Sequence, residues 1–264
     1  SDWSSDVCSS DLFLPDVPKR KPQGANFYPA DMTREEFEAW AQKDTGFFSV
    51  IGREGMGGKA LRAIPYNVAY QEQLTQAAKL LNEAADLTPN ASLKAFLKAR
   101  AEAFLSNDYY ASDVAWMKID APIEPTIGPY ETYMDELFGY KASFEAYITL
   151  RDDAETAKLK MFSDHLQEIE NSLPFDAKYR NPKLGALAPI RVVNEVIATG
   201  DGAHGVRTAA FNLPNDERVV REYGSKRVML KNVQEAKFAK ILMPIASRAL
   251  AKGDQANLSF NAFF

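Results

Sequence analysis

The sequence predicts an α+β fold, in which an N-terminal helical segment precedes a β-rich core with packed helices. Three observations support this prediction. Residues 66–117 carry apolar side chains at helical spacing, broken by Pro89-Asn90. After Lys118, prolines and short runs rich in β-branched residues replace that pattern. Hydrophobic residues make up 46% and charged residues 25% of the 264 positions, which is the ordinary balance of a globular protein.

The region 13–118 is expected to be mostly helical. Thr33 and Glu36 have the spacing of a capping box, which predicts the start of a helix. Strands are expected at 47–51 and 60–64, and the glycine-rich stretch between them is interpreted as a hairpin turn, because its spacing does not fit a phosphate-binding loop. The helices expected after these strands cover residues 66–87, 92–105 and 108–117.

The region 119–264 is expected to be a mixed α/β core. A proline-interrupted strand should end near Tyr130. Further strands are expected at 144–150, 190–199, 206–211 and 227–230, with a loop at 200–205. Helices are expected at 152–173 and 232–250.

The first twelve residues, Ser1–Leu12, are interpreted as a sequencing artefact. The run SDWSSDVCSSDL back-translates into a short-read adapter, so we exclude it from fold reasoning. Without Asp2, Asp6 and Asp11 the 36 acidic residues fall to 33 against 31 basic ones, so the net charge changes from −5 to about −2. The natural N-terminus is then expected to be missing, which leaves both a cytoplasmic and a periplasmic location open.

Composition argues against several classes of protein. The chain has no run of eighteen apolar residues, so no membrane-spanning helix is expected in it. It has no basic block, which argues against a nucleic-acid-binding protein. The single cysteine, Cys8, lies in the adapter run, and the two histidines, His165 and His204, are too far apart for a local metal motif. No metal ligand set is therefore expected in this chain.

Two polar clusters remain as candidates for a functional site. Glu131-Thr132-Tyr133 follows the proline-interrupted strand, and if the strand continued, Glu131 and Tyr133 would share a face. Asn212 and Asn215 flank Leu213-Pro214 after the strand expected to end at Phe211. From chemistry alone, each cluster is more often structural than catalytic.

A family resemblance connects the two clusters. The run IGPYETYMDELFGYKASFEAY (127–147) resembles one signature of the dipeptidyl-peptidase III family of zinc metallopeptidases, and AAFNLPNDERV (209–219) resembles the second. The runs NFYPADMT and VMLKNV also fit in order and spacing. The resemblance covers nearly all of residues 26–264 and is greatest to the shorter bacterial branch. It implies a fold with two lobes around a cleft.

The resemblance also implies a function for each residue. Glu131 would accept the free N-terminal ammonium of a bound peptide, and Asn212 and Asn215 would add neutral hydrogen bonds, so that dipeptides are released. Tyr133 would be catalytic and would donate its hydroxyl to the tetrahedral oxyanion. An HExxH-like zinc motif would begin shortly after Phe264. The chain is thus expected to be a fragment truncated before the zinc-binding lobe, inactive by itself, and dependent on zinc only in the full-length protein.

Two alternatives remain open. A non-catalytic protein could use the same cleft to bind peptides without cleaving them. A helical scaffold with no small ligand is the other alternative, and it would show no peptide binding that depends on Glu131.

Overall fold

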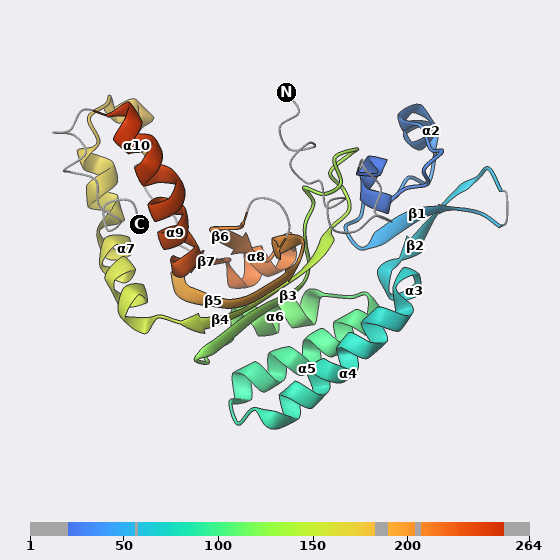
Figure 1. Cartoon of the computed structure of the whole chain (residues 1–264), viewed down its shortest axis with the longest axis horizontal. Coiled ribbons are helices and arrows are strands. Elements are labelled where there is room, and N and C mark those ends of the chain that lie inside the picture. Colours follow the sequence, from blue (N-terminus) through green and yellow to red (C-terminus); the bar gives the residue numbers. More distant parts are fainter. Residues whose placement is uncertain (1–20, 56–57, 183–189, 204–206, 251–264) are drawn as a thin grey trace. The chain divides into compact units, whose positions relative to one another are not determined.

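The computed structural model describes residues 21–55, 58–182, 190–203 and 207–250. Its helices and strands confirm the α+β fold class (Figure 1). The α-helices are α2 (Arg34–Ala39), α3 (Tyr66–Ala69), α4 (Gln71–Leu87), α5 (Ala91–Ser106), α6 (Tyr110–Met117), α7 (Asp153–Ser172), α8 (Glu217–Tyr223), α9 (Lys231–Lys237) and α10 (Met243–Ala249). The strands are β1 (Ser49–Arg53), β2 (Leu61–Pro65), β3 (Ile123–Glu131), β4 (Ser143–Arg151), β5 (Ile190–Gly200), β6 (Ala210–Leu213) and β7 (Lys226–Leu230).

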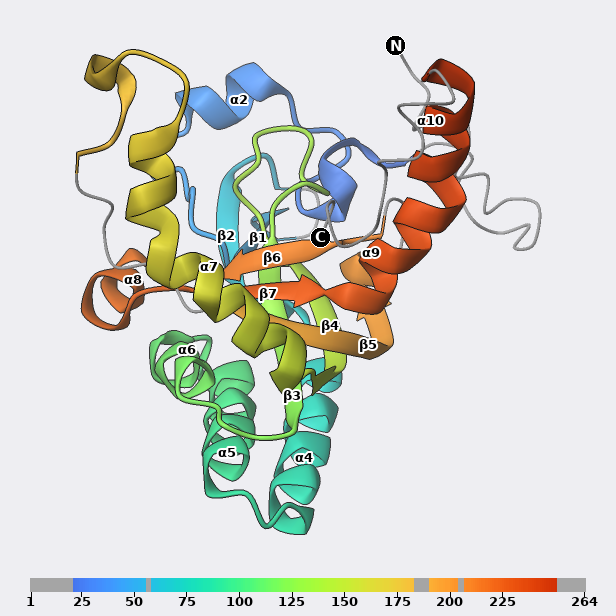
Figure 2. The same ribbon diagram turned by 90° about the vertical axis from the view of Figure 1, so that its left-hand side faces the viewer.

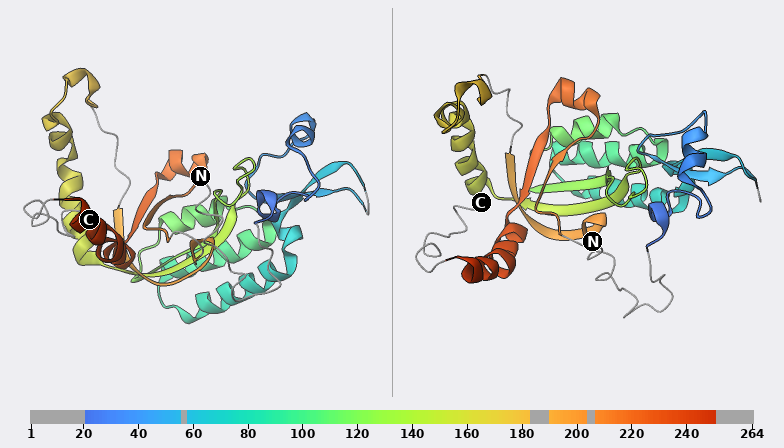
Figure 3. Two further views of the ribbon diagram at one scale, coloured as in Figure 1. Left: turned by 45° about the horizontal axis from the view of Figure 1, so that its top comes forward. Right: turned by 90° about the horizontal axis from the view of Figure 1, so that it is seen from above.

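The strands form two sheets. β1 and β2 pair antiparallel, with Val50 opposite Ile64, which confirms the expected hairpin around the glycine-rich stretch. The larger sheet has the order β3-β4-β5-β7-β6. Figure 2 shows β6 beside β7, and Figure 3 shows the yellow-green strands β3 and β4 beside each other. β5 pairs with β7 in parallel, whereas β6 pairs with β7 antiparallel. β6 is therefore an edge strand of this sheet.

Helices α4 and α5 lie side by side as the expected helical hairpin (Figure 1). The prediction of one helix over residues 66–87 is wrong in one respect, because Tyr70 has φ −119° and ψ 31° and separates α3 from α4. Asn90 starts α5 by accepting a hydrogen bond from the Leu93 N–H at 2.9 Å. Asn107 ends α5 in the left-handed conformation, with φ 66°.

The structure divides into two compact units. The first comprises Ser1–Ile119, Thr126–Tyr147 and Ala198–Val206, and the second comprises Asp120–Pro125, Ile148–Ile197 and Arg207–Phe264. The core of the first unit is rich in buried aromatic residues, among them Phe37, Tyr66, Phe96, Phe104, Trp116 and Tyr147. The core of the second unit is mainly aliphatic and includes Val192, Val193, Leu213, Val219, Val228 and Leu230.

Several expectations for the C-terminal half need correction. β6 begins only at Ala210 and ends at Leu213, so the strand predicted at 206–211 is shorter and lies nearer the C-terminus. Helix α8 was not expected, although Asp216 caps it by accepting a hydrogen bond from the Arg218 N–H at 2.8 Å. Residues 201–203 form a short 3-10 helix, η4, within the expected loop. The closing helix contains the π-helical turn η5 (Phe238–Leu242) between α9 and α10.

Among the described residues, the structure has no helix that is long and apolar enough to cross a membrane. The expectations for Ser1–Leu12, His204 and the C-terminal run LSFNAFF fall outside the described residues.

Candidate functional site

Glu131 is the last residue of β3 and is half-buried. A buried ion pair between α5 and α6 contacts the strand next to Glu131, at Tyr130. Arg100 is fully buried and donates to the Asp113 carboxylate at 2.6 Å and to the Tyr130 hydroxyl at 2.9 Å. Gly128 permits this approach, because a Cβ at that position would lie 2.8 Å from the Arg100 Nη1 atom. The residues that precede Glu131 are therefore firmly placed.

Two further carboxylates lie close to Glu131 within the first unit, and we call Glu131, Glu145 and Asp201 the acidic triplet. Glu145 is on β4 and only 4% exposed, and Asp201 begins η4. Burial raises the pKa of Glu145 to about 8, with a contribution from the negative charge of Glu131. Burial also raises the pKa of Glu131, with a smaller contribution from Asp201. The like charges of Glu131 and Asp201 act on each other here, which makes this a place that attracts a cation.

The polar contacts of Glu145 are incomplete in the described structure. Its Oε2 atom accepts a hydrogen bond from the Tyr147 hydroxyl at 3.3 Å, whereas its Oε1 atom is buried with no partner among the described residues. Gly202 makes room for this tyrosine, since a Cβ there would lie 2.1 Å from the Tyr147 hydroxyl oxygen. A buried acceptor without a donor costs free energy, and a bound donor at this site would remove that cost.

Tyr133 does not share a strand face with Glu131, so that prediction is wrong. β3 ends at Glu131, and Tyr133 lies in a turn of the loop that joins β3 to β4. The loop turns at this point because the Asp135 N–H donates to the Thr132 carbonyl at 3.1 Å. The Tyr133 side chain is 79% exposed. Its hydroxyl is accordingly accessible to a ligand.

Asn212 and Asn215 belong to the second unit. Asn212 is exposed on the edge strand β6, where it stands opposite Arg227 of β7, and its neighbours Phe211 and Leu213 are buried. Asn215 is also exposed and follows Pro214, whose peptide bond with Leu213 is cis. Alternation along β6 thus turns the Asn212 carboxamide away from the core. The Asp216 cap of α8 follows directly and fixes the end of this segment.

The structure therefore places Glu131 together with two acidic residues that the sequence reasoning missed. The sequence signal for Glu145 was its position in β4. It lies two and four residues before the buried Tyr147 and Thr149, so the three side chains share one face of the strand. A carboxylate at an inward position of a strand is unusual and marks a candidate site. Asp201 had no comparable signal, because only the tertiary structure brings η4 near Glu131.

A zinc site does not form among the residues that the structure describes. Within them no group of three or more histidine, cysteine, aspartate or glutamate side chains could hold a metal ion. His165 is an exposed residue of α7 whose Nδ1 atom lies 3.1 Å from Glu168 Oε2, as expected for a surface histidine. The described donor set does not fit a catalytic metal, so any metal chemistry would need other residues.

Comparisons with known proteins show which family the chain resembles in sequence and fold. Residues 59–254 match the model of peptidase family M49. The chain is similar to the structure of dipeptidyl-peptidase III from Corallococcus sp. strain EGB, with 60% identity, a TM-score of 0.82, and 96% of this chain and 48% of that one covered. It is also similar to the structure of DPP III from Caldithrix abyssi, with 53% identity, a TM-score of 0.86, and 93% and 48% covered.

Sequence relatives extend this similarity. A protein named Nudix hydrolase 3 from Arabidopsis thaliana is 46% identical over 273 residues, covering 94% of this chain and 35% of that protein. Dipeptidyl peptidase 3 from Nematostella vectensis is 28% identical over 122 residues, covering 46% and 16%. The chain thus spans about half the length of the solved relatives and about a third of the plant one. With most of its length matched by the family model, the chain belongs to peptidase family M49.

Proposed function

We propose that this chain is the peptide-binding part of a zinc-dependent exopeptidase that releases dipeptides from the N-termini of peptides. Family membership and similarity to two dipeptidyl-peptidase III structures support the reaction class. The acidic triplet carries the proposal for the site. Among the described residues, Glu131 forms no ion pair, so no described side chain neutralises its charge.

In this proposal the cation is the ammonium group at the N-terminus of the substrate. Burying an ammonium without a partner is costly, whereas a half-buried carboxylate gives it a charge-assisted hydrogen bond. Glu131 takes this role, because it is half-buried whereas Glu145 is almost fully buried, so Glu131 keeps its charge more readily. Burial raises the pKa of Glu131 as well. Glu145 is protonated at neutral pH, since its pKa is about 8, and so adds little repulsion to an occupied site.

Asn212 and Asn215 are assigned to the main chain of the first substrate residue. A carboxamide both donates and accepts hydrogen bonds, which suits the mixed groups of a peptide backbone. β6 supports this assignment because it is an edge strand, and an extended peptide can add to such an edge. Fixing the amine and the first residue sets the register, so that cleavage after the second residue releases a dipeptide.

Tyr133 is assigned to the developing oxyanion of the scissile carbonyl. Its exposed hydroxyl can donate a hydrogen bond to a tetrahedral intermediate. The described residues offer no zinc ligands, so the proposal gives this chain binding and orientation and leaves the metal and general base to other sequence. In the complete protein, Tyr133→Phe should lower kcat by roughly ten- to a thousand-fold, and an unchanged kcat would refute this role.

The first experiment is to sequence the gene across both ends of this reading frame. An HExxH-like motif after Phe264, followed by a glutamate ligand, would support the peptidase. A stop codon directly after Phe264 would favour the alternative, a non-catalytic protein that binds peptides through the same residues.

Calorimetry on the chain itself tests the binding half of the proposal. A tripeptide with a free N-terminus should bind, and its N-acetylated form should bind far more weakly, because acetylation removes the ammonium charge. Equal affinity for both peptides would contradict the register set by Glu131. No binding of either peptide would favour a scaffold with no small ligand.

A further inference from the structure

The β3–β4 loop (residues 132–142) is organised around one buried carboxylate, that of Asp135. This side chain is 2% exposed and accepts hydrogen bonds from four backbone N–H groups of its own loop. Oδ1 accepts from Leu137 and Phe138, both at 3.2 Å, and Oδ2 accepts from Tyr140 at 2.9 Å and Lys141 at 3.1 Å. The Asp135 carbonyl also accepts from the Gly139 N–H at 2.9 Å. The loop is therefore wrapped tightly around this residue.

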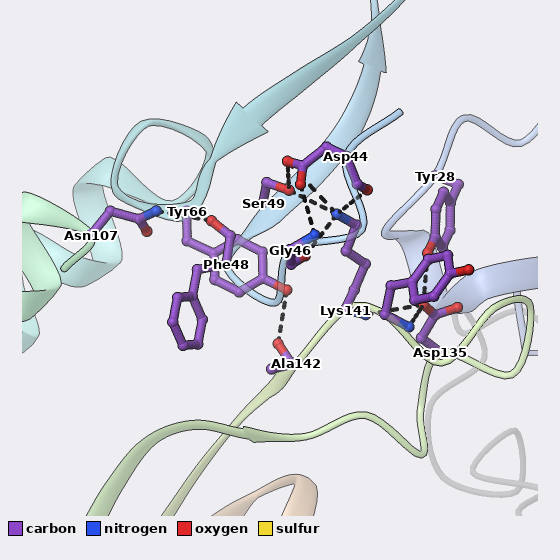
Figure 4. A network of polar contacts seen from close by, with 11 residues as sticks. Tyr28, Asp44, Gly46, Phe48, Ser49, Tyr66, Asn107, Asp135, Lys141 and Ala142 are labelled. Carbon is purple, nitrogen blue, oxygen red and sulfur yellow. Dashed lines mark hydrogen bonds and ion pairs between the residues drawn. The ribbon is translucent and has the colours of Figure 1, made fainter. Parts of the chain in front are cut away.

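A tyrosine from the N-terminal segment completes the Asp135 network. The Tyr28 hydroxyl donates to Oδ2 at 2.6 Å, and Figure 4 shows the two side chains facing each other. Burial and the nearby carboxylate raise the pKa of Tyr28 above its ordinary value, so this phenol remains a donor. The Tyr28 ring also packs against Phe37 and Phe138, with ring centroids 5.8 and 5.6 Å apart. The network is thus anchored in the aromatic core.

The far end of the loop has a separate anchor. The fully buried Lys141 ammonium donates to the Asp44 and Gly46 carbonyls at 3.0 and 2.9 Å and to the Ser49 hydroxyl at 2.8 Å (Figure 4). The Tyr66 hydroxyl donates to the Ala142 carbonyl at 2.8 Å. These bonds hold residues 141–142 but reach none of the residues at the start of the loop.

The start of the loop is joined to Asp135 through the backbone. The Asp135 N–H donates to the Thr132 carbonyl at 3.1 Å and closes the turn that contains Tyr133, so the place of this turn follows the place of Asp135. The other side-chain contacts of this part, from Lys21 to Met134 at 3.9 Å and to Glu136 at 3.0 Å, are on exposed side chains and contribute little. Within the described residues, the Tyr133 side chain has no hydrogen bond that could orient it.

We propose that Asp135 is a positioning residue: its carboxylate holds N–H groups of residues 137–141 and so fixes the place of Asp135, whose own N–H closes the turn at residues 132–134 and thereby aims Glu131 and Tyr133 at the bound peptide. This inference rests on the proposed function, since it gives the loop a role in the same site. Fixing the backbone of a loop residue costs conformational entropy, which the bonds to Asp135 offset before the peptide binds. A loop without this carboxylate would sample many conformations, and apparent affinity falls in proportion to the fraction of molecules in the competent one.

The test is Asp135→Asn, in which an amide NH₂ group replaces one carboxylate oxygen. This group is a donor and cannot accept the hydrogen bonds of the N–H groups that it faces. Affinity for a free-amine tripeptide should fall about ten-fold, measured by calorimetry well below the melting temperature. The ratio of free-amine to N-acetylated affinity should also fall, because Glu131 is no longer held in register. Amide exchange of residues 137–141 should become faster.

Two control variants separate positioning from stability. Lys141→Met removes the far anchor, so the melting temperature should fall while the affinity of folded protein changes less than two-fold. Tyr28→Phe removes one donor and leaves the four backbone bonds, so affinity should change little. An equally large loss of affinity in Lys141→Met and in Asp135→Asn would show that both losses come from general destabilisation. That result would overturn the inference.

The remaining outcomes also distinguish the two proposals. If the wild-type chain binds the tripeptide and folded Asp135→Asn binds equally well, the positioning role is refuted and the proposed function stands. If the wild-type chain binds no free-amine peptide, the proposed function fails and the role of Asp135 in binding fails with it. Faster amide exchange with unchanged affinity would show that the loop order has no bearing on the peptide.

Discussion

The polar groups around Glu131 and those around Asn212 differ in both burial and charge. Around Glu131 the charged groups are buried and act on one another: Arg100 is paired with Asp113, and the Glu145 pKa is raised to about 8. Asn212 and Asn215 are neutral and exposed, and the buried Phe211 and Leu213 hold their segment in place. The first region should therefore control pH dependence and stability, whereas the second should contribute small, pH-independent hydrogen bonds.

The largest expected effect is on stability in the first region. Arg100→Met leaves the buried Asp113 carboxylate without its cation, which should lower the free energy of unfolding by about 3–5 kcal/mol. Urea denaturation measures this loss. The double variant Arg100→Met with Asp113→Asn should recover part of it, because it removes the uncompensated charge. A loss below about 1 kcal/mol in the single variant would show that this pair is not a strong support.

A second effect concerns stability against pH. Because the pKa of Glu145 is about 8 in the folded state, against 4.5 for an ordinary glutamate, the folded state keeps a proton that the unfolded state loses between these values. Its contribution is complete below pH 4.5 and is lost as pH rises towards 8, by up to roughly 4 kcal/mol. In Glu145→Gln this part of the pH slope should disappear. Glu83→Gln, an exposed change on α4, is the control and should leave the slope intact.

A third effect compares the two regions directly through peptide binding. Glu131→Gln removes a charge-assisted hydrogen bond and should weaken binding of a free-amine tripeptide by roughly 30-fold, or about 2 kcal/mol. Asn212→Ala removes a neutral hydrogen bond and should cost about five-fold. Calorimetry with the free and acetylated peptides measures both. Equal losses in the two variants would remove the distinction between the regions.

The smallest expected effect is the pH dependence of binding. As pH falls through the raised pKa of Glu131, the carboxylate is protonated and loses its charge. Affinity for the ammonium should then fall by up to about ten-fold per pH unit, which corresponds to about 1.4 kcal/mol. Asn212→Ala should keep this slope, and Glu131→Gln should lack it. A persistent slope in Glu131→Gln would assign the titration to another member of the acidic triplet.

The sequence predicted the elements whose signals are local. The predicted cap at Thr33, the break at Pro89-Asn90 and the helix expected from residue 152 are all present. In the structure the side chains of Thr33, Asn90 and Asp152 each accept a hydrogen bond from an N–H three residues on. It did not predict α8, because that helix is short and its cap at Asp216 follows a proline turn. The expectation that Glu131 and Tyr133 share a face assumed strand geometry past Tyr130, because nothing local showed that Asp135 would turn the chain.

By itself, the sequence determined the α+β class, the order of most elements and the two runs, 127–147 and 209–219, that lie within the match to family M49. Periodicity, caps and motif spacing are properties of neighbouring residues, so they can be found without the tertiary structure. Only the tertiary structure decided that Glu145 and Asp201 lie near Glu131, that Asp135 gathers the N–H groups of its loop, and that burial shifts the pKa of Glu145. The physical reason is that burial and charge interaction depend on segments far apart in the chain, which become neighbours only when the sheet and helices pack.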